Sequence, residues 1–416
     1  MEIVISDRIR RWLTGALPFY LFTFLPLNLL AQQWTGTWAT ATETPFAKSD
    51  VPQTLSLEGN TLRQVVHVSL GGDVLRLELS NVFGDEPLEI KSVYIADATT
   101  GEQIAATTAR YLLFNAQRGV TIAPRQVVFS DAVMYPLKPL QRLSVTIHYG
   151  IMPKTLTTHR GSRTTSYIMQ GECKPKQPFI IGEQLEHWYT IAAIDVQTTS
   201  PVSCVAVLGN SITDGRGSTT DAQNRWTDVL AEQLEGRVGV LNLGIGGNCV
   251  LQGGLGQPAV DRFDRDILSQ RGVTHLVIYE GINDIGGSKQ VEKTSRQLIR
   301  AYQRFISKAR ERGWKVYLGT ITQMGNTDYW SHFHEACRQT VNEWIRSTVK
   351  SGSNADIPAV DGVLDFDALM RNPEQPTQMR SEWQFDWLHP NAEGYQNMGH
   401  YAAEMLRPTT SETKTE

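Results

Sequence analysis

The stretch Val-Ser-Cys-Val-Ala-Val-Leu-Gly-Asn-Ser-Ile-Thr-Asp-Gly, residues 202–215, decides the fold of the C-terminal half of the chain. Its first seven residues form a compact apolar run of the length of a buried strand, and Gly209 then begins a turn. Apolar side chains next recur at helical spacing over residues 226–234. Ser211 lies at the turn between this strand and the following helical segment, where a serine can project its hydroxyl from the edge of a sheet.

The same alternation of strand and helix continues toward the C-terminus. We predict further strands at 238–243, 274–279 and 315–321, and amphipathic helices at 293–312 and 334–349. This β-α-β-α order predicts an α/β domain over residues 200–408, with a flavodoxin-like parallel sheet and helices on both faces. In such sheets, functional residues gather at the carboxyl ends of the strands.

The N-terminal half has a different period. In residues 74–79, three leucines alternate with charged residues, which is typical of a half-buried antiparallel strand, and residues 143–148 repeat the pattern. No long helical period accompanies these runs. We therefore predict an all-β sandwich of jelly-roll type over residues 32–199, joined to the α/β domain by the small polar stretch 198–201.

The two ends of the chain differ from these domains. In residues 1–31, three arginines precede an apolar stretch, which is typical of a cleaved secretory signal peptide. The alternative is an uncleaved membrane anchor, but Pro18 and Pro26 interrupt a run that is already short of the roughly 20 apolar residues of a membrane span. We expect a secreted or periplasmic protein with no stable membrane insertion after signal cleavage. Residues 409–416 are expected to form a flexible tail.

Composition excludes several classes of protein. The chain is 41% hydrophobic and 20% charged, which is ordinary for a globular protein. A net charge of −4, without a run of Lys and Arg, disfavours a nucleic-acid partner. The four cysteines (Cys173, Cys204, Cys249 and Cys337) form no C-x-x-C pair for zinc, and their pairing is left open.

Short motifs follow three of the predicted strands and recur near the C-terminus. They are Gly209-Asn210-Ser211-Ile212, Gly244-Ile245-Gly246-Gly247-Asn248, Gly281-Ile282-Asn283-Asp284 and Asp386-Trp387-Leu388-His389. Together they resemble the SGNH (GDSL-like) hydrolases, in which a Ser, a Gly, an Asn and a His lie in separate blocks in this order. The resemblance covers residues 203–406. The first half, from Trp34, is similar to the β-domain that accompanies certain secreted bacterial members.

The resemblance implies a role for each block. Ser211 is the implied nucleophile, and its backbone amide, the amide of Gly247 and the side-chain amide of Asn283 form the implied oxyanion hole. A serine hydroxyl needs a base to take its proton, and His389 has the pKa range for that task. Asp386, three residues earlier, can accept a hydrogen bond from the other ring nitrogen. Neither a metal nor a cofactor is required.

The chain departs from the family signature Gly-Asp-Ser-Leu at two positions, since Asn210 replaces Asp and Ile212 replaces Leu. The first change puts the local hydrogen bonds beside the nucleophile in doubt. The G-x-S-x-G elbow of the α/β-hydrolases is absent because Thr213 occupies its last position. Asp214 and Asp284 are predicted to be turn or cap residues rather than ligands of a divalent cation.

These observations predict a secreted serine esterase that hydrolyses carboxylic esters, with acetyl groups of an oligo- or polysaccharide as substrate. The Gly-rich segment 248–258 slightly favours a small acyl group. Three tryptophans in irregular segments, Trp330, Trp383 and Trp387, are candidates for stacking on sugar rings. The alternatives are a lipase or long-chain acyl esterase, a catalytically silent carbohydrate-binding protein and a metal-dependent phosphoesterase.

Overall fold

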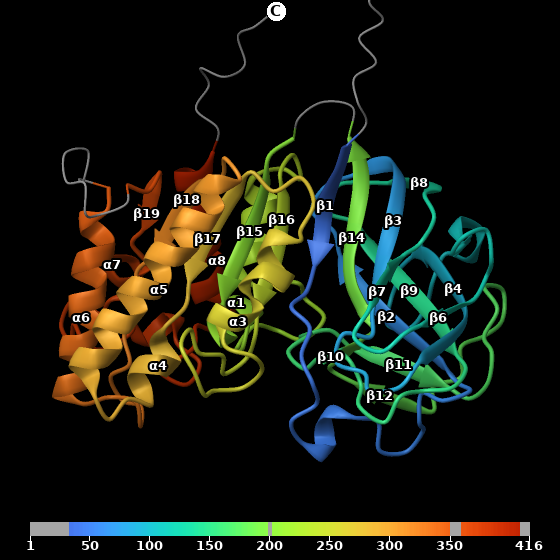
Figure 1. Cartoon of the computed structure of the whole chain (residues 1–416), viewed down its shortest axis with the longest axis horizontal. Coiled ribbons are helices and arrows are strands. Elements are labelled where there is room, and N and C mark those ends of the chain that lie inside the picture. The colour runs from blue at the N-terminus through green and yellow to red at the C-terminus, as the bar shows by residue number, and fades with distance from the viewer. Residues whose placement is uncertain (1–32, 199–201, 350–358, 408–416) are drawn as a thin grey trace, which may run out of the picture. The chain divides into compact units, whose positions relative to one another are not determined.

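The computed structural model describes residues 33–198, 202–349 and 359–407 (Figure 1). The predicted signal peptide, residues 199–201 of the predicted linker and the predicted tail lie outside the described residues. We call residues 33–198 the β-region and residues 202–407 the α/β-region, and both belong to one structural unit. None of the helices within the described ranges is long and apolar enough to cross a membrane.

The β-region is built from antiparallel strands. They are β1 (Gln33–Ala39), β2 (Thr61–His67), β3 (Gly72–Ser80), β4 (Leu88–Asp97), β5 (Arg110–Leu112), β6 (Val120–Ile122), β7 (Val127–Phe129), β8 (Val133–Leu137), β9 (Arg142–Tyr149), β10 (Thr158–His159), β11 (Ser166–Met169), β12 (Glu183–Leu185), β13 (Trp188–Tyr189) and β14 (Ile191–Thr198), with the 3-10 helices η1 (Lys48–Asp50) and η2 (Ala106–Thr108). One sheet has the order β1-β14-β3-β7, with β8 also on β3. A second has the order β12-β11-β2-β9-β4-β5, with β6 also on β4, and β10 pairs with β13.

The two large sheets share one hydrophobic core. Leu75, Leu77 and Leu79 of β3 are fully buried, and the charged residues between them are partly exposed. The leucines belong to the same cluster as Val145 and Ile147, which lie on β9 of the other sheet. The predicted antiparallel β-sheets are therefore confirmed, whereas the jelly-roll connectivity stays a prediction.

The α/β-region alternates strands with helices. Its elements are β15 (Cys204–Gly209), α1 (Ser211–Asp214), α2 (Trp226–Gln233), β16 (Gly239–Gly244), α3 (Ala259–Phe263), the π-helix η3 (Asp264–Leu268), β17 (His275–Tyr279), α4 (Ile282–Gly286), α5 (Val291–Glu311), β18 (Lys315–Gly319), α6 (His332–Ser347), β19 (Gly362–Leu364), α7 (Phe366–Met370), η4 (Ser381–Trp383) and α8 (Ala392–Leu406). The predicted strands and helices are present within two residues of their expected bounds. Helix α6 begins at His332 rather than at residue 334 because Ser331 caps it, its side chain accepting a hydrogen bond from the amide of His334.

All five strands of the α/β-region are parallel, in the order β16-β15-β17-β18-β19. Along the chain, the sheet is extended toward one edge from β15 to β16 and toward the opposite edge from β17 through β18 to β19. Right-handed crossovers therefore place α2 on one face and α5 and α6 on the other. Contacts agree, since α2 packs against α8 and α5 against α6. The predicted parallel sheet with helices on both faces is thus confirmed.

Strand register places the candidate site. Gly209 at the end of β15 is paired with Gly244 on β16 and with Tyr279 on β17. The loops that follow these residues therefore start side by side, at the point where the strand order reverses. Ligands of open parallel sheets bind at this kind of position.

The edge strand β16 faces the β-region. The amide of Val240 donates to the hydroxyl of Ser69 over 2.9 Å, and strand β1 lies against β16. Gly36 on β1 permits this approach, because a Cβ there would come within 2.9 Å of the Leu241 side chain. Ala39 on β1 and Ala193 on β14 belong to the hydrophobic core of the α/β-region.

Candidate active site

Ser211 is the first residue of α1, directly after β15. Asn210 caps this helix, since its side-chain oxygen accepts a 3.0 Å hydrogen bond from the amide of Ile212. An asparagine oxygen can do this as well as a carboxylate, so the Asn in place of the family's Asp keeps a side-chain cap without the charge. The helix ends after four residues at Gly215, whose φ of 100° suits glycine. Ser211 is thus fixed at both sides of a short turn.

The structure brings Ser211, His389 and Asp386 into one chain of hydrogen bonds. The Ser211 hydroxyl lies 2.7 Å from His389 Nε2, and His389 Nδ1 lies 2.9 Å from each carboxylate oxygen of Asp386. Because Nδ1 faces only acceptors, it carries the ring proton, and Nε2 accepts the hydrogen bond from the serine. Ser211 and His389 are buried, and the Asp386 side chain is 35% exposed.

The turn between Asp386 and His389 holds the carboxylate. Burial acts to raise the pKa of Asp386, but hydrogen bonds from the His389 ring and from the amides of His389 and Leu388 lower it well below its ordinary value. Trp387 adopts a φ of 66° in this turn, a conformation that non-glycine residues rarely adopt. The Arg216 guanidinium lies 3.6 Å from the carboxylate. Asp386 therefore stays ionised at neutral pH and can stabilise a positive charge on the imidazole.

Gly247 and Asn283 lie at the same pocket. Together with Ser211 and His389 they line a cavity of about 360 Å³. Gly247 has a φ of 72°, which glycine adopts without strain, and a Cβ there would come within 2.9 Å of Leu255.

Two contacts orient the side chain of Asn283. Its NH₂ group donates to the carbonyl of Asn248 over 2.7 Å, and its oxygen accepts a hydrogen bond from the Tyr329 hydroxyl over 3.1 Å. The NH₂ group has two N–H donors, and the bond to Asn248 uses one of them. Tyr329 could not be predicted from the sequence, because it lies in a loop after β18 and belongs to no motif.

The β-region supplies one wall of this pocket. Glu43, Arg160, Arg163 and His187 line it beside the catalytic candidates. Arg160 donates to the Glu43 carboxylate over 2.7 Å, and its Nη2 lies 3.4 Å from the carbonyl of Gly246 in the loop after β16. The sequence patterns assigned no role to these residues, because the stretch Arg160-Gly161-Ser162-Arg163 lies between two short strands and matches no motif.

The two aspartates predicted to be turn or cap residues have different roles. Asp284 lies in α4, but its carboxylate accepts hydrogen bonds from the amides of Val250 and Leu251 in the loop after β16 instead of capping its own helix, and burial raises its pKa to about 6. For Asp214 the prediction is wrong. Its carboxylate bonds to two side chains of the β-region, His159 at 2.8 Å and Arg163 at 3.2 Å.

Other candidates lie elsewhere. The three tryptophans predicted to stack on sugar rings are not among the residues that line the pocket; they are Trp330, Trp383 and Trp387. The four cysteines are free thiols in buried positions. Within the described ranges, no three His, Cys, Asp or Glu side chains gather closely enough to hold a metal ion.

A buried serine bonded to a histidine, which is bonded in turn to a carboxylate, at the strand ends of a parallel sheet, is the arrangement of a serine hydrolase on an α/β fold. Residues 207–396 match the GDSL-like lipase/acylhydrolase family. This part of the chain is therefore an SGNH hydrolase domain, and the protein is a carboxylic ester hydrolase with an additional N-terminal β-region.

Several solved structures resemble about half of the chain. A lipolytic protein of the G-D-S-L family from Desulfitobacterium hafniense is 21% identical, with 49% of this chain and 99% of that chain covered and a TM-score of 0.37. A GDSL-like lipase from Bacteroides thetaiotaomicron is 19% identical, with 48% and 86% covered and a TM-score of 0.36. An acetylxylan esterase from Geobacillus stearothermophilus is 14% identical, with 50% and 97% covered and a TM-score of 0.37. No curated protein matches the chain.

Proposed function

We propose that this protein hydrolyses short acyl esters, acetyl esters above all, of an oligo- or polysaccharide through an acyl-serine intermediate. The observation that carries the proposal is the chain of hydrogen bonds from Ser211 through His389 to Asp386 at a pocket with polar walls.

In the first half of the proposed reaction, His389 Nε2 takes the proton from the Ser211 hydroxyl as the oxygen attacks the ester carbonyl. Asp386 stabilises the imidazolium that forms. In this proposal, the backbone amides of Ser211 and Gly247 and the N–H of Asn283 that is not bonded to Asn248 donate to the oxyanion. Nε2 then protonates the departing sugar oxygen, and the acyl group stays on the serine.

In the second half, water enters the site and loses its proton to His389 Nε2 as it attacks the acyl carbon. Collapse of the second tetrahedral intermediate releases the carboxylic acid and returns the proton to Ser211. The atoms balance without a metal or cofactor, and each proton passes through one ring nitrogen.

The lining of the pocket supports a sugar rather than a long acyl chain. Most of the side chains that line the pocket around the serine are charged or polar, and Leu255, Leu388 and Tyr329 add apolar surface. A neighbouring cavity of about 550 Å³ shares Gly247, Asn283 and Tyr329 with this pocket and is lined by both polar and apolar surface. The charged and polar side chains of both cavities would give sugar hydroxyls hydrogen-bond partners, which a hydrocarbon chain cannot use.

The proposal is tested by acetate release from a panel of acetylated polysaccharides, with Ser211→Ala as the inactive control. We expect release by the wild-type protein and covalent labelling of Ser211 by a fluorophosphonate. A chain-length profile on synthetic esters separates the alternatives, because preference for octanoate over acetate would favour a lipase. Polysaccharide binding without any ester turnover would favour a silent carbohydrate-binding protein.

We further propose that the protein acts outside the cytoplasm, because the n-region and apolar stretch of residues 1–31 have the pattern of a secretory signal. Fractionation of the cells that make the protein tests this, with residence in the cytoplasm as the contradicting result.

A further inference from the structure

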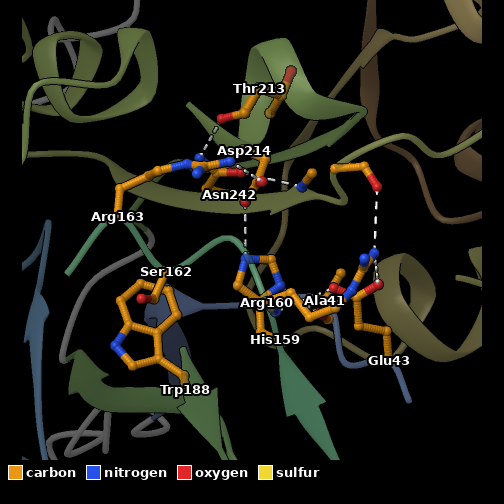
Figure 2. A network of polar contacts seen from close by, with 12 residues as sticks. Ala41, Glu43, His159, Arg160, Ser162, Arg163, Trp188, Thr213, Asp214 and Asn242 are labelled. Carbon is orange, nitrogen blue, oxygen red and sulfur yellow. Dashed lines mark hydrogen bonds and ion pairs between the residues drawn. The ribbon is translucent and has the colours of Figure 1, made fainter. Parts of the chain in front are cut away.

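A buried ion pair joins the β-region to the turn that carries the candidate nucleophile (Figure 2). His159, at the end of β10, places its Nε2 atom 2.8 Å from a carboxylate oxygen of Asp214, the last residue of α1. The two side chains are 4% and 1% exposed. The partners lie 55 residues apart in the sequence and belong to different regions.

The surroundings of His159 fix its charge. Its Nδ1 atom lies 2.8 Å from the carbonyl oxygen of Ala41, and its Nε2 atom faces the Asp214 carboxylate. Both partners can only accept, so both ring nitrogens must donate, and only the imidazolium has two N–H groups. The ring also stacks on Trp188 at 5.7 Å, an arrangement that favours a cation.

The pKa values point the same way. Burial acts to lower the pKa of His159, but the charge of Asp214 and the hydrogen bonds raise it above its ordinary value. Burial acts to raise the pKa of Asp214, but His159 and Arg163 lower it. The charged groups that face the pair are Glu43, Arg160, Arg163 and Arg225. Arg163 shares the carboxylate, and Arg225 donates to the backbone oxygen of Asp214 over 3.3 Å.

The fit around Asp214 leaves little room. A Cβ on Gly161 of the β-region would lie 1.9 Å from a carboxylate oxygen of Asp214. A Cβ on Gly244, at the end of β16, would lie 2.5 Å from the Asp214 amide. The two glycines therefore let the β-region and the sheet close on α1 from two sides.

Asp214 is tied to Ser211 through a single turn. The Asp214 amide donates to the carbonyl of Asn210 over 2.8 Å. The amides of Gly215 and Arg216 both donate to the carbonyl of Ser211 over 2.9 Å. Because α1 has only four residues, a shift of Asp214 must be taken up by the backbone of Ser211 itself.

We propose that His159 is a positioning residue for ester hydrolysis: its imidazolium holds Asp214 and thereby fixes the turn that aims Ser211 at His389. This rests on the proposed function, and it makes the β-region part of the catalytic apparatus. His159 itself is placed to act through Asp214, without touching the substrate.

The chain contains a matched control. His67 on β2 forms the same kind of pair, with Nδ1 3.3 Å from the Asp228 carboxylate and Nε2 3.0 Å from the carbonyl of Leu140. This pair also joins the β-region to a helix, but the helix is α2, which carries none of the proposed catalytic residues. His67→Gln therefore reports the cost of losing such a pair without removing a direct partner of Asp214, because Asp228 reaches the nucleophile turn only through Arg225.

The experiment compares His159→Gln and His67→Gln in the full chain on a short-chain p-nitrophenyl ester. Both variants are expected to lower the melting temperature. Only His159→Gln is expected to lower kcat, at least about tenfold, with little change in KM, since a misplacement of about 1 Å can cost roughly 100-fold. The rate of fluorophosphonate labelling of Ser211 should fall in parallel. The kcat of the wild type should fall as pH rises through the raised pKa of His159, and the variant should lack this limb.

Gly161→Ala provides a second route if His159→Gln does not fold. It keeps the imidazolium but forces the β-region away from Asp214, and the same loss of kcat is expected. The inference is overturned if the folded His159 or Gly161 variant keeps the kcat and labelling rate of His67→Gln. Failure of the proposed function looks different, because the wild-type protein itself would then neither hydrolyse esters nor be labelled at Ser211.

Discussion

Arg262 is the residue whose loss should reveal how the strand-end loops are held together. It is fully buried on α3, and its guanidinium donates to the carbonyl of Gly209 at 3.0 Å, the carbonyl of Leu243 at 2.8 Å and the side-chain oxygen of Asn248 at 2.9 Å. One side chain thus connects the end of β15, the end of β16 and the loop that contains Gly247. Arg262→Met keeps much of the volume and removes all of these donors.

The size of the effect follows from the carboxylate left behind. Arg262 lies 3.7 Å from Glu280, whose side chain is fully buried and whose oxygens have no hydrogen-bond partner among the described residues. Burial raises the pKa of Glu280 to about 7, and Arg262 opposes the rise. Asp266 also contacts Arg262 but keeps two bonds to Arg265. Removing one partner of a buried pair costs about 3–5 kcal/mol, a large share of a typical stability of about 5–15 kcal/mol.

Urea unfolding of the wild type and Arg262→Met, followed by circular dichroism, measures this loss. Because burial raises the pKa of Glu280, its carboxylate destabilises the folded state most at high pH, where the group is ionised. The loss of unfolding free energy in Arg262→Met should therefore be larger at pH 8 than at pH 5.5. Glu280→Gln in the Arg262→Met background should recover part of it, because the buried charge is gone. A loss below about 1 kcal/mol, well short of what an orphaned buried charge costs, or no recovery in the double variant, would refute the reasoning.

Further expectations concern the oxyanion donors and the interface between the regions. Asn283→Ala should lower kcat roughly 10²- to 10³-fold with a smaller change in KM, and an unchanged kcat would exclude the side chain as an oxyanion donor. Gly247→Ala should also lower kcat, because the residue has a φ of 72° and a Cβ would meet Leu255; equal turnover would contradict this. In the His67–Asp228 pair, burial acts to lower the pKa of His67, but Asp228 raises it above its ordinary value. The stability that the charged His67 provides is therefore lost as pH rises through that raised pKa. Burial opposes the low pKa of Asp228, but Arg225 and His67 bring it from 3.8 to about 2, so its stabilisation is lost as pH falls through that range. Melting temperatures across pH should therefore decline at both ends, and His67→Gln should weaken both declines.

Local patterns were sufficient to predict the fold and the order of the catalytic blocks. The strands of the α/β-region are continuous apolar runs, and its helices carry the helical period, so each is visible within a window of a few residues. The candidate triad is equally local in part, because Asp386 and His389 are three residues apart. Ser211 could be placed at a sheet edge because the turn follows a strand directly.

The contribution of the β-region could not be predicted in the same way. His159 and Asp214 form their contact although they lie 55 residues apart in the sequence. Neither belongs to a repeat or motif from which this contact could be predicted. Asp214 also fits a turn residue by its position, which is why its prediction was wrong. Such contacts arise from packing between regions, and a single sequence carries no periodicity that reports them.

The β-region covers the edge strand β16, and this contact limits how the hydrolase half can be produced or recombined without it. An open parallel sheet ends in a strand with unpaired amides, and such an edge invites pairing with other chains. Here the hydroxyl of Ser69 and strand β1 occupy that edge. A hydrolase half produced alone would expose it, so aggregation is the expected fate of a truncated chain. Exchange of the β-region for an unrelated module would meet the same obstacle.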